Sequence, residues 1–322
     1  MTTPRISARL RTAAVGAALL TFAIAQATGA NALSSTTARY GLTLSATSTT
    51  NVDALSAGHR TRPKPSATAT KTATTSPKPT APASTLTPVP STAPVYAGWK
   101  ADWVDDFNLP MDQTGWTAYG WGYQVPGQGA MGRYLQSNTF MANGVMTLRT
   151  QYVNGEWSSA GVSSGDFYSV AGGRWEVRAK FPQSKGIGYA FLLYPDDGTW
   201  PPEFDFAEGR VNGPEIDATY HWSSQNYQDL SILNNADMHS WHTYGVIIGT
   251  NTITWTFDGQ PWKVITNNSV TTKKMWIGFQ CGAMDPNGSA SQYETVDNGI
   301  PGPLTPAISD IQIDWAAHYT KA

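Results

Sequence analysis

The sequence predicts an all-β fold in which two antiparallel sheets pack face to face as a sandwich. Apolar and polar side chains alternate with the period of two that a half-buried strand requires, and no stretch of 12 residues shows convincing helical periodicity. Glycine and proline interrupt the pattern throughout, as at Gly172-Gly173 and Pro201-Pro202. Many short strands separated by frequent turns are typical of a two-sheet sandwich.

Two strands are the clearest. In 174–181 every second residue from Trp175 to Phe181 is apolar, and the residues between them are charged. In 311–315 the two isoleucines and the tryptophan occupy one face, and the two polar residues occupy the other. We therefore expect each strand to bury its apolar face against the second sheet.

A separate hairpin is predicted at 253–265, which lies between these two strands in the sequence. Residues 253–257 alternate, and Asp258-Gly259 follows as a two-residue turn. The return strand then covers 262–265. Asp-Gly between alternating segments is one of the strongest local signals for a hairpin, because both turn residues must adopt a positive φ.

The chain divides into three parts of different composition. Residues 1–32 are interpreted as a secretory signal peptide, because three arginines precede the apolar run 13–25 and small residues offer cleavage sites. A retained N-terminal anchor is the alternative. Residues 33–98 form a disordered linker rich in Pro, Thr and Ser, with eight Pro and nine Thr in 63–94 alone. All thirteen Trp lie in 99–322, which is therefore the folded domain.

Charge and cysteine content restrict the partners. Residues 99–322 carry 12 basic and 22 acidic side chains, a net charge of −10, which argues against nucleic acid and against polyanionic substrates. The single cysteine, Cys281, cannot form an intramolecular disulfide, and we expect it to be a buried apolar residue. Beyond export, nothing predicts membrane contact, and we expect a monomer.

An acidic motif stands out because the chain has only six glutamates and two of them lie five positions apart, in 203–208. In a regular strand Glu203 and Asp205 share one face, whereas Glu208 points to the other. One bulged residue near Phe206-Ala207 brings Glu208 back to the face of the other two. We therefore predict three carboxyl groups on one face, with the core behind them.

Three like charges on one surface suit retaining glycoside hydrolysis, which needs two carboxyl groups about 5–5.5 Å apart, one as nucleophile and one as proton donor. Two glutamates four paired positions apart lie about 13 Å apart at Cα, and their side chains reach towards each other. A central aspartate can help to separate the two pKa values. The alternatives are a solvated acidic strand and a Ca²⁺ cluster, but the flanking aromatic residues argue against a solvated face.

With this motif, residues 99–320 resemble glycoside hydrolase family 16, the laminarinase and lichenase group. The segments 172–181, 220–222 and 241–259 are also similar to strands of that family. The resemblance implies a β-jelly roll with a concave substrate cleft, on the bulged, laminarinase-like branch. The segment 188–192 departs from the family, because it lacks the common Trp-Pro-Ala-Phe-Trp sequence.

The resemblance also implies roles for individual residues. Glu203 is the expected nucleophile, Glu208 the general acid/base with a raised pKa, and Asp205 the assisting carboxylate. No cofactor is expected for catalysis. One structural Ca²⁺ is implied at Asp314 on the convex side, together with the Gly144 loop and the segment 103–107; the melting temperature would then depend on calcium.

Aromatic residues near the motif are candidates for sugar binding, because Trp and Tyr rings stack on the apolar faces of sugar rings. His221 is a candidate hydrogen-bond partner of the acid/base or of a sugar hydroxyl, with a structural role as the alternative. For His239 and His242, three residues apart, structural roles are preferred to a metal pair. The aromatic candidates are Trp200, Trp121, Trp222 and Tyr189.

The sequence therefore predicts a secreted, retaining endo-β-glucan hydrolase that acts on a polysaccharide. β-1,3-glucan is the first expected substrate, mixed β-1,3-1,4-glucan the second and a galactan the third. A catalytically inactive glycan-binding protein is the alternative from another class, and the presence of both glutamates favours the enzyme. A transglycosylase also fits, because an acceptor sugar competes with water for the same intermediate.

Overall fold

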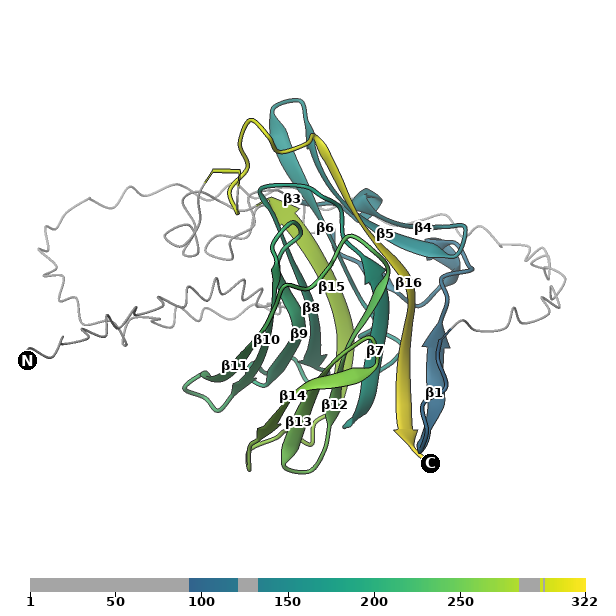
Figure 1. Cartoon of the computed structure of the whole chain (residues 1–322). Coiled ribbons are helices and arrows are strands. Elements are labelled where there is room, and N and C mark those ends of the chain that lie inside the picture. Colours follow the sequence, from purple (N-terminus) through teal and green to yellow (C-terminus); the bar gives the residue numbers. More distant parts are fainter. Residues whose placement is uncertain (1–92, 121–132, 284–295, 298) are drawn as a thin grey trace, which may run out of the picture. The chain divides into compact units, whose positions relative to one another are not determined.

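The computed structural model describes residues 93–120, 133–283, 296–297 and 299–322. This part of the chain is built almost entirely of strands (Figure 1), with short 3-10 helices at Met111–Gln113 and Gln136–Asn138. None of its helices is long and apolar enough to cross a membrane. The strands are β1 (Trp99–Asp105), β2 (Thr117–Ala118), β3 (Arg133–Tyr134), β4 (Thr139–Ala142), β5 (Val145–Val153), β6 (Glu156–Ser163), β7 (Gly173–Lys180), β8 (Ile187–Pro195), β9 (Glu203–Arg210), β10 (Glu215–Trp222), β11 (Tyr227–Asn234), β12 (His242–Ile248), β13 (Thr252–Phe257), β14 (Gln260–Thr266), β15 (Met275–Ala283) and β16 (Ile308–Lys321).

The strands hydrogen-bond in the order β11-β10-β9-β8-β15-β6-β5-β16-β7-β12-β13-β14. We call β11 to β6 in this order the first sheet, and β5 to β14 the second sheet. Neighbours along the whole path are antiparallel, and the short β3 joins β6 in parallel. The connection between β6 and β5 joins the two sheets, which face each other as two layers (Figure 1). The predicted all-β, two-sheet antiparallel jelly-roll sandwich is confirmed.

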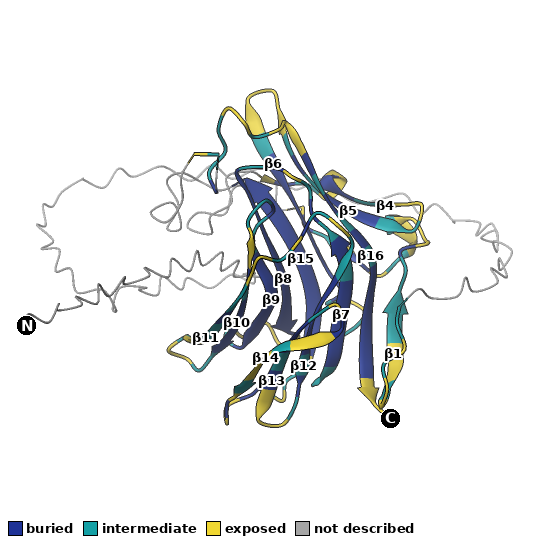
Figure 2. Cartoon of the chain, viewed as in Figure 1, coloured by how far each residue is buried: buried dark blue, intermediate teal, exposed yellow. Residues whose placement is uncertain are grey.

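Aromatic side chains from both sheets meet in the core. Phe204 of the first sheet lies 6.4 Å from Trp255 of the second between ring centroids, and Phe191 lies 6.5 Å from Tyr244. Burial is concentrated along the strands, and hairpin tips are exposed (Figure 2). Each large apolar side chain buried in this way contributes roughly 1.5–3 kcal/mol to folding.

The predicted strands at 174–181 and at the hairpin are confirmed. The apolar residues of β7 are fully buried in the core. In the hairpin, Asp258 and Gly259 have φ of 49° and 71°, the positive values that a tight turn between twisted strands requires. The hairpin places Ile253 and Trp255 in the core.

The prediction for 311–315 is wrong for Trp315. The pairing of β16 with β7 shifts between Ile313 and Trp315, so Asp314 is an extra residue in the ladder. A shift of one residue moves every later side chain to the other face. Ile313 therefore packs in the core between the sheets, and Trp315 packs on the outside of the second sheet with Tyr319.

The last residues of the predicted linker, 93–98, pack against the domain. Tyr96 lies over the guanidinium group of Arg174, 3.3 Å from its carbon to the ring centroid, and makes an edge contact with Tyr319. The hydroxyl of Tyr319 donates to the carbonyl of Pro94 at 2.9 Å. Trp315, exposed to this side by the register shift, completes the cluster.

The segment 93–98 lies beside a buried ion pair on the outside of the second sheet. Arg174 and Glu176 are 2.7 Å apart, and both are almost completely buried. Arg174 also donates to the carbonyl of Gly259, and Thr256 donates to Glu176. Burial raises the pKa of Glu176 to about 7, because the loss of solvation outweighs the attraction of Arg174.

This pKa makes stability depend on pH. When a carboxyl group binds its proton more tightly in the folded than in the unfolded state, the protein loses stability as pH rises. For Glu176 this window runs from 4.5, its ordinary pKa, to about 7, its pKa in the folded state. Glu176 should lower the free energy of unfolding by up to about 3 kcal/mol across this window. We would measure the free energy of unfolding in urea at pH 5 and at pH 7.5. The difference between these two free energies should be smaller in Glu176→Gln than in wild type. The exposed Glu156→Gln variant is the matched control, and an equal reduction in both variants would contradict the assignment.

Candidate active site

The three acidic residues of the motif lie on β9 and share one face. Asp205 pairs with Thr219 of β10 and Glu208 pairs with Asp217, so three steps along β9 match two steps along β10. The ladder with β8 shifts at the same place. The predicted bulge at Phe206-Ala207 is therefore confirmed. Both phenylalanines of the motif point into the core by alternation, and the bulge brings Glu208 to the outer face of the first sheet, where Glu203 and Asp205 already stand.

The ladder also fixes the spacing of the glutamates. Glu203 pairs with His221 and Glu208 pairs with Asp217, which are four positions apart on β10. Four strand positions span about 13 Å at Cα, as the sequence predicts. Asp205 lies between them, so a substrate bond held above Asp205 is within reach of both glutamates.

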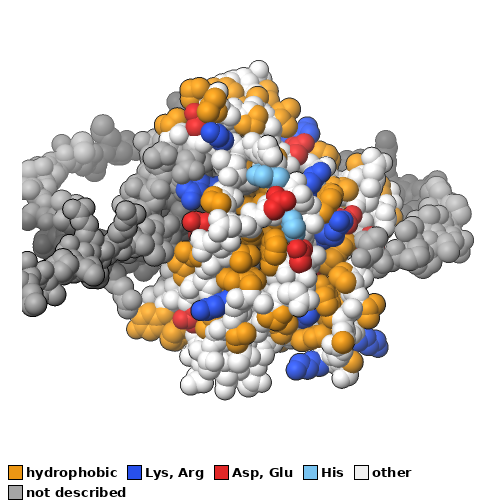
Figure 3. Space-filling model, viewed as in Figure 1, with side chains coloured by type: hydrophobic (Ala, Val, Ile, Leu, Met, Phe, Trp, Pro, Cys, Tyr) orange, Lys and Arg blue, Asp and Glu red, His pale blue; other side chains and the backbone are white. Residues whose placement is uncertain are grey.

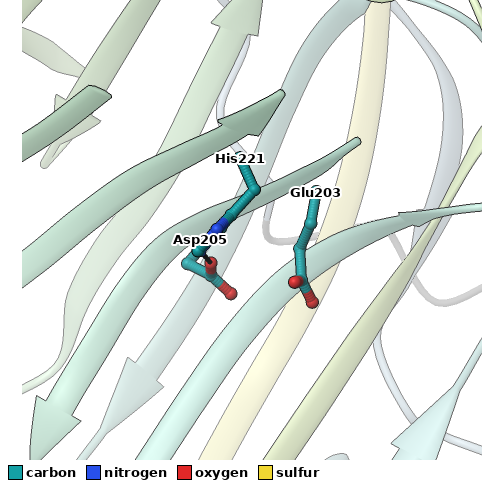
Figure 4. A group of neighbouring side chains, drawn as sticks. All are labelled: Glu203, Asp205 and His221. Carbon is teal, nitrogen blue, oxygen red and sulfur yellow. Dashed lines mark ion pairs between the residues drawn. The ribbon is translucent and has the colours of Figure 1, made fainter. Parts of the chain in front are cut away.

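Glu203 is completely buried and is held by the indole of Trp200. The Trp200 Nε1–H donates to Glu203 Oε2 at 2.6 Å, and Glu203 Oε1 has no hydrogen-bond partner among the described residues. The neighbouring Asp205 Oδ2 lies 3.1 Å from His221 Nε2 (Figure 4). His221 Nδ1 in turn lies 2.7 Å from Asn226 Oδ1. Trp200 therefore restrains Glu203, and His221 restrains Asp205.

Burial and neighbouring charge shift the pKa values in this group. Burial raises the pKa of Glu203 well above its ordinary range, the charge of Asp205 raises it further, and the Trp200 hydrogen bond lowers it. Burial lowers the pKa of His221, but the hydrogen bond and charge of Asp205 outweigh this and raise it overall. A protonated His221 donates from both ring nitrogens, to Asp205 and Asn226. The structure thus places a raised pKa on Glu203, and the raised pKa expected at Glu208 stays a prediction.

Glu203, Asp205 and His221 form a group that could hold a metal ion. Among the described residues, one ligand atom each from Glu203, Asp205 and His221 lie within 4.8 Å of one another. The lone pairs that a metal would use are those that the acid–base chemistry of the motif requires.

Other predicted binding residues lie in different places. Trp200 and His221 are part of the site, with 5.8 Å between their ring centroids. Trp222 is the neighbour of His221 on β10, so its side chain points to the opposite face and packs on the core. Tyr189 is fully buried in the core against Phe181. The predictions that Trp222 and Tyr189 bind substrate are therefore wrong, and Trp121 lies outside the described residues.

Sequence reasoning missed aromatic residues beside Glu203. Leu193 of β8 pairs with Phe204, so the next residue, Tyr194, lies beside Glu203. Trp276 of β15 pairs with Tyr194, and the two ring centroids are 5.3 Å apart. Tyr119 lies over Gly161, where a Cβ atom would be 2.2 Å from its ring, so only glycine fits there. The signal for Trp276 was the alternation of polar residues or glycine with apolar residues in 275–283.

The residues predicted for calcium converge away from this site. Ile313, which precedes Asp314, pairs with Met146, two residues after Gly144, and the Gly144 turn lies against Asn108 Oδ1 and the Asp106 carbonyl. These are oxygen donors, which suit Ca²⁺, although Asp314 also pairs with Arg178. The ion stays a prediction.

Two other expectations concern side chains outside the site. Cys281 is fully buried as expected, and its thiol accepts a hydrogen bond from Thr150. Burial raises the thiol pKa to about 12. His242 lies 2.8 Å from Asp258 and stacks on Phe257, which are structural contacts. His239 contacts the Phe181 carbonyl.

Comparison with known proteins decides the family. Residues 129–316 match the model of the family described as Glycosyl hydrolases family 16, which is more than half of the chain. The chain belongs to glycosyl hydrolase family 16. It is therefore a glycoside hydrolase.

The chain is also similar to individual proteins named as β-glycan-cleaving enzymes. The chain is 34% identical over 129 residues to the endo-1,3-1,4-beta-glycanase ExsH of Rhizobium meliloti, covering 36% of this chain and 28% of that protein. It is 25% identical over 279 residues to the glucan endo-1,3-beta-glucosidase A1 of Niallia circulans, covering 71% and 39%. The chain thus spans well under half the length of these relatives.

Solved structures show the same fold. The catalytic domain of an endo-1,3-beta-glucanase (laminarinase) from Thermotoga petrophila aligns with a TM-score of 0.58 at 19% identity, over 69% of this chain and 98% of that one. An endo-beta-1,3-glucanase from Pyrococcus furiosus aligns with a TM-score of 0.56 at 20% identity, over 70% and 95%.

The contact between Trp200 and Glu203 predicts a change in pH dependence. Trp200→Phe removes a donor that favours the charged form of Glu203, so the pKa of Glu203 should rise. If activity requires ionised Glu203, the acid limb of the kcat/KM profile should move up by roughly one pH unit. Trp222→Phe, whose indole lies on the opposite face, should leave that limb in place. An unmoved limb in Trp200→Phe would show that this contact does not tune Glu203.

Proposed function

We propose that this family 16 hydrolase is a secreted enzyme that cleaves β-1,3-glucan or mixed β-1,3-1,4-glucan within the chain and with retention of anomeric configuration. The observation that carries the proposal is the bulged β9, which presents Glu203 and Glu208 on one face with Asp205 between them. A covalent double displacement needs two such carboxyl groups, and it needs no metal or cofactor.

In the proposed reaction, ionised Glu203 attacks the anomeric carbon while protonated Glu208 donates its proton to the leaving glycosidic oxygen. The C–O bond of the substrate breaks as the Glu203–carbon bond forms. Glu208, now ionised, takes a proton from water, and the oxygen of that water displaces Glu203. Two inversions at one carbon give net retention.

The contacts of the site support this division of roles. Glu203 must be ionised to attack, and the Trp200 N–H stabilises the charge on the oxygen that it contacts. His221, with its raised pKa, compensates the charge of Asp205 and so reduces the repulsion between Asp205 and Glu203. Glu203 Oε1, which has no partner among the described residues, remains available to form the bond to carbon.

Charge supports a neutral polysaccharide as substrate. The site contains three carboxyl groups, and Asp217 stands beside Glu208 on the next strand. In the view of Figure 3, charged side chains of both signs are scattered among apolar ones, without the broad basic patch that binds nucleic acid. The relatives named above are described as an endo-1,3-1,4-beta-glycanase and a glucan endo-1,3-beta-glucosidase, and the second description supports a neutral glucan.

The N-terminal sequence supports the secretion of the enzyme. The arginine-rich start, the apolar run 13–25 and the following small residues support secretion. A polysaccharide too large to enter a cell is hydrolysed outside it, which agrees with such a signal. We propose a monomer.

A substrate screen tests the proposed function. Wild-type protein should release short oligosaccharides from laminarin and lichenan, with a rapid fall in polymer length that marks cleavage within the chain. Agarose should not be degraded. The Glu203→Gln protein, with nearly the same side-chain volume, is the control for contaminating activity. Binding of laminarin by wild type without any product would instead indicate a glycan-binding protein, and longer products formed with an added acceptor would indicate a transglycosylase.

The two glutamates should differ in chemical rescue. With Glu208→Ala and a substrate that has a good leaving group, the glycosyl-enzyme still forms, and azide attacks it to give a product of retained configuration. With Glu203→Ala, azide replaces the nucleophile and gives the inverted glycosyl azide. Chromatography and NMR of the products distinguish the two. Opposite configurations would reverse the assignment, and near-wild-type activity of Glu203→Ala would refute the mechanism.

A further inference from the structure

Gln280 is a buried polar residue that the proposed mechanism does not use. Its neighbours on β15, Phe279 and Cys281, point into the core, so Gln280 stands on the opposite face, which is the face of the carboxyl groups. It is 0% exposed, and its Nε2 has no hydrogen-bond partner among the described residues. Burying an N–H donor without a hydrogen-bond partner lowers the stability of the folded protein, so the position of this amide needs an explanation.

Tyr134 fixes the orientation of the amide. Its hydroxyl donates to Gln280 Oε1 at 3.2 Å, and both side chains are fully buried. Burial raises the pKa of Tyr134 well above its ordinary value, so the hydroxyl stays neutral and remains a donor. Because the carbonyl end of the amide is held by Tyr134, the two N–H groups are directed elsewhere on this face.

The register places Gln280 level with Glu208. Gln280 pairs with Ala190, and Ala190 pairs with Glu208, so two strand spacings of about 10 Å in total separate Gln280 from Glu208 at Cα. Only the methyl group of Ala190 stands between them. On the other side Gln280 pairs with Gly161, which has no side chain and is covered by the ring of Tyr119. The face of Ala190 is therefore flanked by the acid/base on one side and by an amide donor on the other.

We propose that Gln280, oriented by Tyr134, is a substrate-binding residue whose amide N–H donates to a hydroxyl oxygen of a neutral sugar unit held above Ala190. The proposal rests on the proposed function of the site. Glu208 and Asp217 on the same level would repel an anionic group, so the acceptor is an uncharged hydroxyl. The two strand spacings between Gln280 and Glu208 place this sugar unit away from the scissile bond itself.

Kinetics on oligosaccharides of increasing length test the proposal with the full chain. In Gln280→Leu, kcat/KM should fall about tenfold on long β-glucan oligosaccharides, mainly through KM, because one hydrogen bond to substrate is lost. The loss should vanish for oligosaccharides too short to reach Ala190. Tyr134→Phe should give a smaller loss, about threefold, with the same dependence on length.

Gln312→Leu, on the second sheet, is the matched control and should behave as wild type at every length. An unchanged kcat/KM in Gln280→Leu, or an equal loss at all lengths, would overturn the proposal, since equal loss indicates a structural role. If Gln280→Leu does not fold, Gln280→Asn retracts the amide and should give the same length-dependent loss. Failure of wild type to cleave β-glucans would refute the proposed function instead, and the variants would then be compared on the polysaccharide that it does cleave.

Discussion

The extra residue in β9 is the constraint on which the site depends. Side chains in a strand alternate strictly, so a motif with an odd spacing cannot place both of its glutamates on one face of a regular ladder. Because β10 and β8 both shift their pairing at Phe206-Ala207, the irregularity belongs to β9 itself, between two regular neighbours. The same bulge lets Phe206 and Ala207 both pack in the core, so one local feature sets the face of the carboxyl groups and the packing behind it.

Several carboxyl groups buried on one strand lose solvation and repel one another when ionised. Neighbouring residues stabilise the charges of Glu203 and Asp205 in different ways. Glu203 receives a neutral N–H donor, which stabilises its charge without adding a charge of its own. Asp205 receives an imidazole that its own charge helps to protonate. Asp205 thus raises the pKa of His221, whereas burial and the charge of Asp205 leave Glu203 with a raised pKa, so that the ionisation of Glu203 is sensitive to substitutions in this group.

Local patterns predicted the parts of this protein that depend on residues close in sequence. The acidic motif, the bulge and the hairpin at Asp258-Gly259 needed only spacing and turn chemistry. Trp315 was misplaced because its orientation depends on an extra residue in the pairing of β16 with β7, strands more than 120 residues apart. Tyr189 was misplaced for a related reason, since the segment around it is apolar on both faces, and only the register with β9 shows which one meets the substrate. Gln280 became interpretable through two successive strand pairings.

The packing of 93–98 determines where the N-terminal region leaves the domain. Tyr96 and Pro94 contact the outside of the second sheet through Arg174 and Tyr319, whereas the carboxyl groups stand on the outside of the first sheet. The described chain therefore enters the domain on the back of the sandwich, on the side opposite the acidic strand. The contacts that hold this entry point belong to the second sheet, so the bulge in β9 takes no part in them.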